Sequence, residues 1–128
     1  SKDKCENFRT TINPIEKHLL HLPKIKSVKW KVQTFGNDAR WISVPGPSNY
    51  RIKGYAKFEI DELEEVISKF EDFIDDAPYV DFPYSENEEK YNWKCSQLFT
   101  EMVKPKLLIG SVWVCVEKGL IYFDLEGE

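Results

Sequence analysis

The residues of this chain that could do chemistry are two histidines, three cysteines and a large set of carboxylates. His18 and His21 lie three positions apart in a segment with helical periodicity, so both could point to one side of a helix. Two histidines make only part of a zinc site, and neither a further ligand pair nor a zinc-protease pattern accompanies them. We therefore expect no metal ion and interpret both histidines as surface or boundary residues.

The cysteines and the carboxylates indicate no catalytic site. Cys5, Cys95 and Cys115 are an odd number without close spacing, and Cys115 lies among valines, where a free cysteine acts as a small hydrophobic residue. No nucleophile elbow, P-loop or dinucleotide-binding fingerprint occurs. Nothing in the sequence marks any two carboxylates as different from the rest. The sequence therefore predicts a protein that is not an enzyme and has no cofactor.

The length and composition are typical of one globular domain, over residues 1–128. The chain has 18 Lys and Arg, 22 Asp and Glu, a net charge of −4 and 14% aromatic residues. This aromatic content excludes a disordered chain, and three cysteines are too few for a disulfide scaffold. No apolar run approaches the roughly 18 residues of a membrane helix. The mild acidity argues against direct binding of nucleic acid, because phosphates attract basic proteins.

The start of the chain and its cysteines bear on where the protein works. Residues 1–4 are polar and no apolar stretch follows them. Such a start fits removal of an initiator methionine, and it equally fits removal of an export signal. An exported chain usually pairs an even number of cysteines, so we expect a cytoplasmic protein. An exported structural or accessory domain is the alternative, which a disulfide at Cys5 would favour.

The charge is distributed unevenly along the chain. Residues 1–58 hold 12 basic and 4 acidic side chains (+8), residues 59–89 hold 1 and 13 (−12), and residues 90–128 hold 5 of each. The acidic segment has two interpretations. It is either a solvated helix face and loop, partly paired with basic strands, or a docking surface for a basic protein. Aromatic residues between its prolines favour docking, because buried rings dominate binding energy. The candidate partner-binding residues are Glu65, Asp72, Asp75, Asp76, Tyr79, Asp81, Tyr84 and Glu88.

Hydrophobic periodicity predicts the elements of the first half. Apolar residues at steps of three and four predict a short helix that begins at Asn13 and Pro14 and ends before Pro23. Alternation from residue 26 predicts a strand, which we expect to form a hairpin with a second strand over residues 40–44. Two prolines then make a rigid turn, and a third strand with one basic face follows over residues 50–58. Within it, Gly54 marks a bulge or the close approach of another backbone.

The second half is predicted to hold two helices and a hairpin. The capping pattern of Asp61 and Glu64 predicts a helix over residues 61–75. Another helix is expected over residues 93–103. Its inner side chains would be Cys95, Leu98, Phe99 and Met102. Strands over residues 107–116 and 120–125 have few charges, so their hairpin should lie in the middle of the sheet. Together the elements predict an α+β fold, an antiparallel sheet of about five strands with about three helices on one face.

Two resemblances bear on function. A V-P-x-P-x-x-Y turn that leads into a strand, then an acidic helix and a terminal hairpin, resembles small bacterial proteins of unknown function. Its residues here are Val44, Pro45, Pro47 and Tyr50. The small size, the acidity and the lack of a catalytic signature resemble, at the level of the class, the immunity proteins of bacterial toxin systems, including contact-dependent inhibition. That resemblance implies a cognate toxin, commonly a basic nuclease, blocked by occlusion of its active site.

We therefore expect a protein that binds and neutralises a basic protein partner by steric and electrostatic blockade. The alternative is a small-ligand-binding domain or an enzyme with a pocket near the turn at residues 45–55. Its expected lining is aromatic and contains Trp41, Tyr50 and Tyr55, with Arg51 as the polar group.

Overall fold

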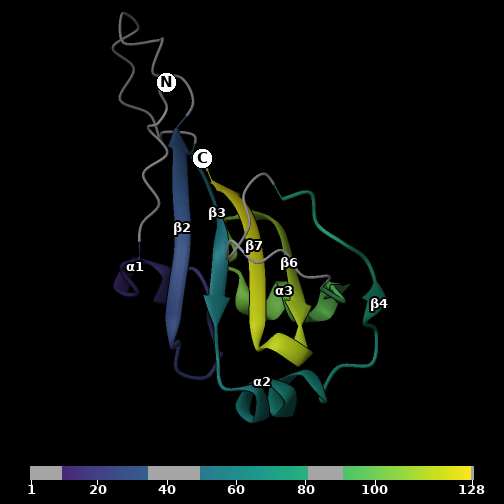
Figure 1. The fold of residues 1–128 in the computed structure, drawn as a ribbon. Coiled ribbons are helices and arrows are strands. Elements are labelled where there is room, and N and C mark those ends of the chain that lie inside the picture. The colour runs from purple at the N-terminus through teal and green to yellow at the C-terminus, as the bar shows by residue number, and fades with distance from the viewer. Residues whose placement is uncertain (1–9, 35–49, 81–90, 128) are drawn as a thin grey trace, which may run out of the picture.

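The computed structural model describes residues 10–34, 50–80 and 91–127. Within these residues the chain forms one six-stranded antiparallel sheet with the strand order β2-β3-β7-β6-β5-β4 (Figure 1). Three α-helices and one 3₁₀ turn accompany the sheet. The predicted α+β class and antiparallel sheet are confirmed. Four of the six strands were predicted, and the two-residue strands β4 and β5 were not.

The elements have the following bounds. The strands are β2 (Ser27–Thr34), β3 (Tyr50–Lys57), β4 (Ile74–Asp75), β5 (Lys94–Cys95), β6 (Ile109–Cys115) and β7 (Leu120–Gly127). The helices are α1 (Asn13–Glu16), α2 (Ile60–Ile67), α3 (Gln97–Val103) and the 3₁₀ turn η2 (Val116–Lys118). The hairpin of β6 and β7 occupies the middle of the sheet, as predicted. Across the described residues, no helix has the length and apolar character that crossing a membrane requires.

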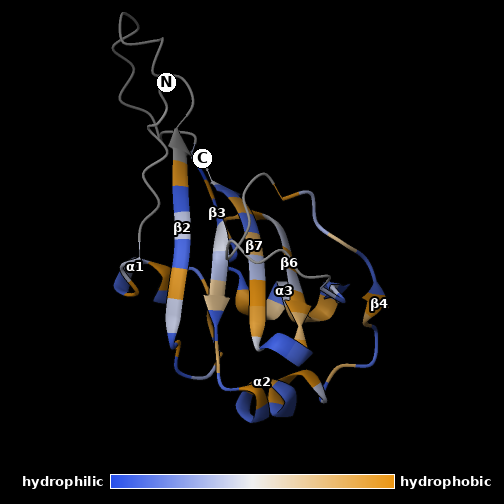
Figure 2. Cartoon of the chain, in the orientation of Figure 1, coloured by the Kyte–Doolittle hydropathy of each residue, from blue (hydrophilic) through white to orange (hydrophobic). Residues whose placement is uncertain are grey.

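The two faces of the sheet carry different clusters. On one face, α1, α2 and α3 contribute Ile15, Leu63 and Phe99 to the main core, which also contains Trp30 and Phe123 from the strands. Helices on one face were predicted, and this common core confirms it. The opposite face carries a separate cluster. Its members are Tyr55, Trp93, Cys115, Leu120 and Tyr122, with Tyr91 and Trp113 packed against them. In Figure 2 hydrophobic residues lie along β7, whereas α2 mixes hydrophobic and hydrophilic residues.

Strands β2 and β3 pair closely because Gly54 has no side chain. Gly54 lies opposite Trp30 in the register. A Cβ added at Gly54 would lie 2.5 Å from the carbonyl oxygen of Lys29 and would also collide with the Cβ of Trp30. The predicted close approach of another backbone is therefore confirmed. The neighbour of β2 is β3, whereas the hairpin partner predicted at residues 40–44 lies outside the described residues.

The first predicted helix is shorter than expected. α1 is a single turn that ends at Glu16, although Ile15 and Leu19 are buried as their spacing predicted. The chain leaves the helix because the N–H of Leu20 donates to the carbonyl oxygen of Val103 at 2.7 Å. Residue His21 then adopts a φ of 62°, which no α-helix contains.

The acidic helix is also shorter, and its predicted start was wrong. α2 begins at Ile60 after Glu59, so the pattern of Asp61 and Glu64 is not a capping box. The helix ends at Ile67 instead of continuing to residue 75. A longer helix would place acidic pairs at positions 71 and 75 and at 72 and 76, where like charges repel. Instead, Phe70 and Phe73 turn onto Phe99, with ring centroids 5.5 and 5.6 Å away.

The third helix begins four residues later than predicted. α3 starts at Gln97 because the Ser96 side chain accepts a hydrogen bond from the N–H of Phe99 at 3.0 Å, a typical N-cap. The residues Lys94 and Cys95 before it form β5 and pair with β6. Phe99 is buried as predicted, but the prediction for Leu98 was wrong, since its side chain is 60% exposed.

Candidate partner-binding surface

Five carboxylates of α2 and the segment after it are exposed and have no counter-ion among the residues that the structure describes. We call this group the acidic surface. It consists of Asp61, Glu62, Glu64, Glu65 and Glu71, all exposed. Within the part of the chain that the structure describes, none of the five forms an ion pair or a side-chain hydrogen bond. Neighbouring Glu59 differs, because it pairs with Lys26 at 3.1 Å. The acidic surface therefore keeps its charge available to another molecule.

The position of these acids on α2 is only partly explained by helix stability. Asp61 and Glu62 lie in the first turn, where the helix dipole favours negative charge. Glu64 and Glu65 lie in the last turn, where the dipole disfavours it, and that turn contains no basic residue. The carboxylates at the end of α2 thus lower the stability of the helix, as residues that serve binding often do.

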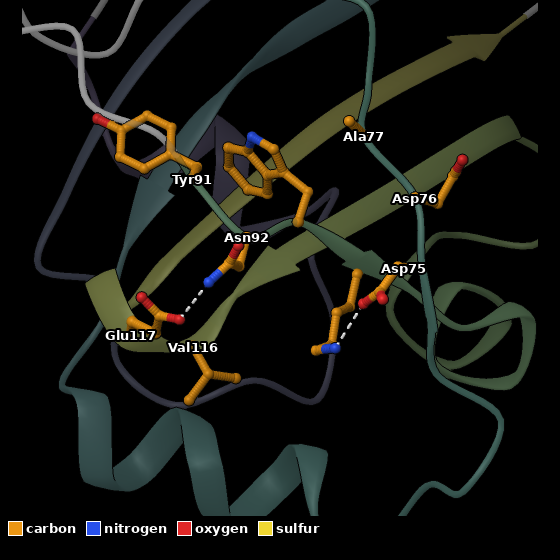
Figure 3. A pocket seen from close by; sticks show the side chains of 9 residues that line it. Asp75, Asp76, Ala77, Tyr91, Asn92, Val116 and Glu117 are labelled. Atoms are coloured by element: carbon orange, nitrogen blue, oxygen red, sulfur yellow. Dashed lines mark hydrogen bonds and ion pairs between the residues drawn. The ribbon is translucent and has the colours of Figure 1, made fainter.

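A second feature is an open hollow of about 860 Å³, which includes Val116 and Glu117 of η2 and which we call the hollow. The residues that line it are Asp75, Asp76, Ala77, Tyr91, Asn92, Trp93, Lys94, Val116 and Glu117. They come from β4, β5, η2 and the adjoining segments, and η2 packs directly against α2. Figure 3 shows Asn92 and Glu117 on one side of the hollow, Asp75 and Asp76 on the other, and α2 beneath them.

Short hydrogen bonds hold the walls of the hollow. The Asn92 side chain donates to Glu117 at 2.6 Å, and Lys94 donates to Asp75 at 2.6 Å. The Tyr91 and Trp93 rings meet edge to face, with centroids 5.5 Å apart. Three carboxylates against one lysine leave the lining with a net negative charge. Carboxylates beside aromatic rings suit the cationic head of a lysine or arginine side chain.

The structure describes five of the eight predicted partner-binding residues, and they fall in four different settings. Glu65 belongs to the acidic surface, whereas Asp75 and Asp76 line the hollow. Asp76 also accepts a hydrogen bond from the Trp113 indole at 2.9 Å. Tyr79 stands apart from both groups and is 84% exposed. Asp72 has a different role, described next. The remaining three lie outside the described residues. They are Asp81, Tyr84 and Glu88.

Asp72 fastens the segment after α2 to the start of α3. Its carboxylate accepts hydrogen bonds from the Ser96 hydroxyl and from the N–H of Leu98, the latter at 3.1 Å. The hydrogen bond from Ser96 lowers the pKa of Asp72 below its usual value, and backbone N–H groups, among them that of Leu98, lower it further. A lowered pKa means that the carboxylate stabilises the fold only while it is ionised.

We therefore expect Asp72→Asn to weaken the acid dependence of stability. In the native chain this contribution is complete above the unfolded pKa of about 3.9 and is lost as the pH falls through the lower folded pKa. Urea unfolding between about pH 2.5 and 6 should show a steeper loss of stability below about pH 4 for the native chain than for the variant. Equal slopes for the two proteins would contradict the role of Asp72.

The hollow itself was not predicted from the sequence. Trp93 was placed at the start of a helix, and Asn92 and Glu117 were not singled out. The signal that could have found the hollow is the N-cap at Ser96, which puts Trp93 before the helix and in the alternation of a strand with Cys95.

The other predicted sites stand as follows. His18 hydrogen-bonds the carbonyl oxygen of Pro14 at 2.9 Å, and the described residues contain no group of three potential metal ligands. Tyr50 packs against the main core, whereas Tyr55 lies in the cluster on the opposite face. These two rings therefore do not line one pocket, and Trp41 lies outside the described residues. Comparisons with protein-family models, curated proteins and solved structures find no match for this chain.

Proposed function

We propose that this protein binds a basic protein partner through the acidic surface and the hollow, and that it acts by occlusion and not by catalysis. The observation that carries the proposal is the set of five exposed carboxylates without counter-ions, next to an acidic hollow with aromatic walls. Uncompensated charge on a folded domain raises the rate at which an oppositely charged partner associates.

The two features would contribute differently to binding. The acidic surface, with Glu64 and Glu65 at its centre, would steer the partner and speed association. The hollow would hold a lysine or arginine of the partner between its carboxylates and the Tyr91 ring, which slows dissociation. A surface of this kind suits a protein that must capture its partner quickly and hold it.

The resemblance to bacterial immunity proteins suggests what the partner is. A toxin nuclease carries a basic surface for phosphates, and an acidic protein that covers this surface would block it. We propose a cytoplasmic location, which the free thiols of Cys95 and Cys115 fit. The proposed role is therefore neutralisation of a toxin nuclease by steric and electrostatic blockade.

The test is identification of the partner followed by neutralisation. The tagged full chain would be purified from its native cells at about 50 and about 500 mM salt, and bound proteins would be identified by mass spectrometry. A basic protein recovered with the native chain, but not with Glu64→Lys/Glu65→Lys, would then be produced alone. We expect the native chain to abolish its toxicity on co-expression. Recovery of the same protein by both chains, or unchanged toxicity, would contradict the proposal.

Binding of a small ligand is the competing function, and the size of the hollow favours it. A volume of about 860 Å³ lies within the usual range for ligand sites. Native mass spectrometry of the freshly purified chain would detect such a ligand. In that case Tyr91→Ala should release the ligand, whereas Glu64→Lys/Glu65→Lys, which lies outside the hollow, should retain it.

A further inference from the structure

A second, smaller opening lies where the sheet is incomplete. β6 pairs with β7 along all of Ile109–Cys115, but it pairs with β5 only at Trp113 and Val114. In the described part of the chain, the edge of β6 over residues 109–112 therefore faces no strand on that side. An opening of about 440 Å³ occupies this place, and we call it the notch.

At the notch, a side chain meets the backbone of β6 where a neighbouring strand would otherwise lie. The Thr100 hydroxyl takes the place of a strand at Val112, because it lies 3.3 Å from the Val112 N and 3.4 Å from its carbonyl oxygen. Gly110 lies two residues earlier and lines the notch. Gly110 has a φ of 147°, so the backbone at this end of β6 departs from the regular strand geometry.

The side chains around the notch combine exposed apolar groups with acids. Ile74 lines the notch and is 64% exposed. Leu98 and Ile109, which are 60% and 68% exposed, are the chain neighbours of the lining residues Gln97 and Gly110. The lining includes Asp76 and Glu101, and no lysine or arginine is found among its described residues. Exposed apolar side chains beside an open strand edge are typical of sites that take up an extended peptide.

The notch and the hollow share one lining residue, Asp76. A segment that alternates basic and apolar residues suits both the acids and the exposed apolar side chains at the notch. Its basic side chains would meet Asp76 and Glu101, and its apolar side chains would cover Leu98 and Ile74.

We infer that the notch receives an extended basic segment of the partner, which adds to the edge of β6 at Gly110 as a further strand. The inference rests on the proposed function, because it specifies how the same basic partner is held. Main-chain hydrogen bonds at the edge would provide affinity, and the alternating side chains would provide specificity.

A synthetic peptide tests this inference without the natural partner. The probe is a ten-residue peptide that alternates lysine and valine, and the control peptide alternates glutamate and valine. Titration of the ¹⁵N-labelled full chain should shift the amide signals of Gly110 and its neighbours, and should slow hydrogen exchange at Gly110. The glutamate peptide should leave these signals unchanged. Shifts by both peptides, or no shift at Gly110 with either, would overturn the inference.

Two matched variants separate the notch from the acidic surface. Ile74→Ser, the rim variant, removes an exposed apolar side chain that lines the notch, whereas Leu107→Ser changes a side chain that is 88% exposed and lies outside the lining. We expect the rim variant to bind the lysine peptide roughly tenfold more weakly and the control to bind as the native chain does. If the peptide shifts only α2 and η2, the notch is excluded while the acidic surface stands. If the lysine peptide shifts no amide signal of the chain, both proposals fail.

Discussion

Reversal of two charges at the end of α2 should slow association with the basic partner by roughly 10- to 100-fold at low salt. The variant is Glu64→Lys/Glu65→Lys, which replaces two carboxylates of the acidic surface that lack counter-ions. The dissociation rate should change little, because long-range steering acts before contact. Stopped-flow or biosensor kinetics at several ionic strengths would measure both rates, and the difference between the two proteins should shrink as salt rises.

The control is a variant with the same change in net charge at the other end of the molecule. Glu16→Lys/Glu126→Lys replaces two exposed acids on α1 and β7. Its association rate should stay within about threefold of the native rate, since distance and salt screen the effect. Equal slowing by both double variants would show that net charge alone matters, and it would exclude the acidic surface as the docking site.

The charge reversal Glu64→Lys/Glu65→Lys should not weaken the fold. Lysines at positions 64 and 65 would face the negative end of the α2 dipole, and a lysine at 65 would pair with Asp61 one turn earlier. We expect the free energy of unfolding to be equal or a few tenths of a kcal/mol higher. Slower association with undiminished stability would mark Glu64 and Glu65 as binding residues.

The largest effect on stability is expected for Gly54→Ala. The added methyl group would lie 2.5 Å from the Lys29 carbonyl oxygen and against Trp30, so β2 would have to move away from β3. Forced overpacking of this kind costs about 3 kcal/mol or more, a large part of the 5–15 kcal/mol that holds a typical domain. Urea unfolding measures the loss. Lys57→Ala on the same strand is the control, and it should change stability by about 0.5 kcal/mol or less.

A loss below about 1 kcal/mol for Gly54→Ala would contradict the close pairing of β2 and β3. Circular dichroism of the variant at low temperature separates a destabilised fold from an unfolded chain. If the variant does not fold at all, Gly54→Ser adds no information, because serine carries the same Cβ and a hydroxyl group besides. Urea unfolding with a stabilising osmolyte present then gives the free-energy difference.

The parts of the fold that the sequence predicted are those governed by local patterns. Alternation along β2 and β3 predicted these strands, because a two-residue period is clear when the two faces of a strand differ. The apolar sequences of β6 and β7, with few charges on either face, predicted the central hairpin. The end of α2 was missed. Phe70 and Ile74 continue the helical spacing, but tertiary contacts with Phe99 and pairing with Cys95 decide their structure.

The site was predictable only where exposure follows from helix geometry. Glu65 lies opposite the buried Leu63 side of α2, so its exposure follows from the amphipathic pattern. Asp72 carries the same charge and lies in the same acidic segment. Its carboxylate, however, accepts a hydrogen bond from Ser96, the N-cap of α3, which lies 24 positions away in the sequence. The hollow depends on β5 and η2, and no local pattern shows that these two short elements lie together.

Hydrogen exchange of the complex would test the central claim most directly. The chain would be exchanged alone and with its basic partner, and protection would be read by mass spectrometry or by NMR. We predict that the partner protects α2, η2 and β5, which frame the acidic surface and the hollow. Protection confined to β2 and β3, on the basic side of the sheet, would contradict the proposed docking surface.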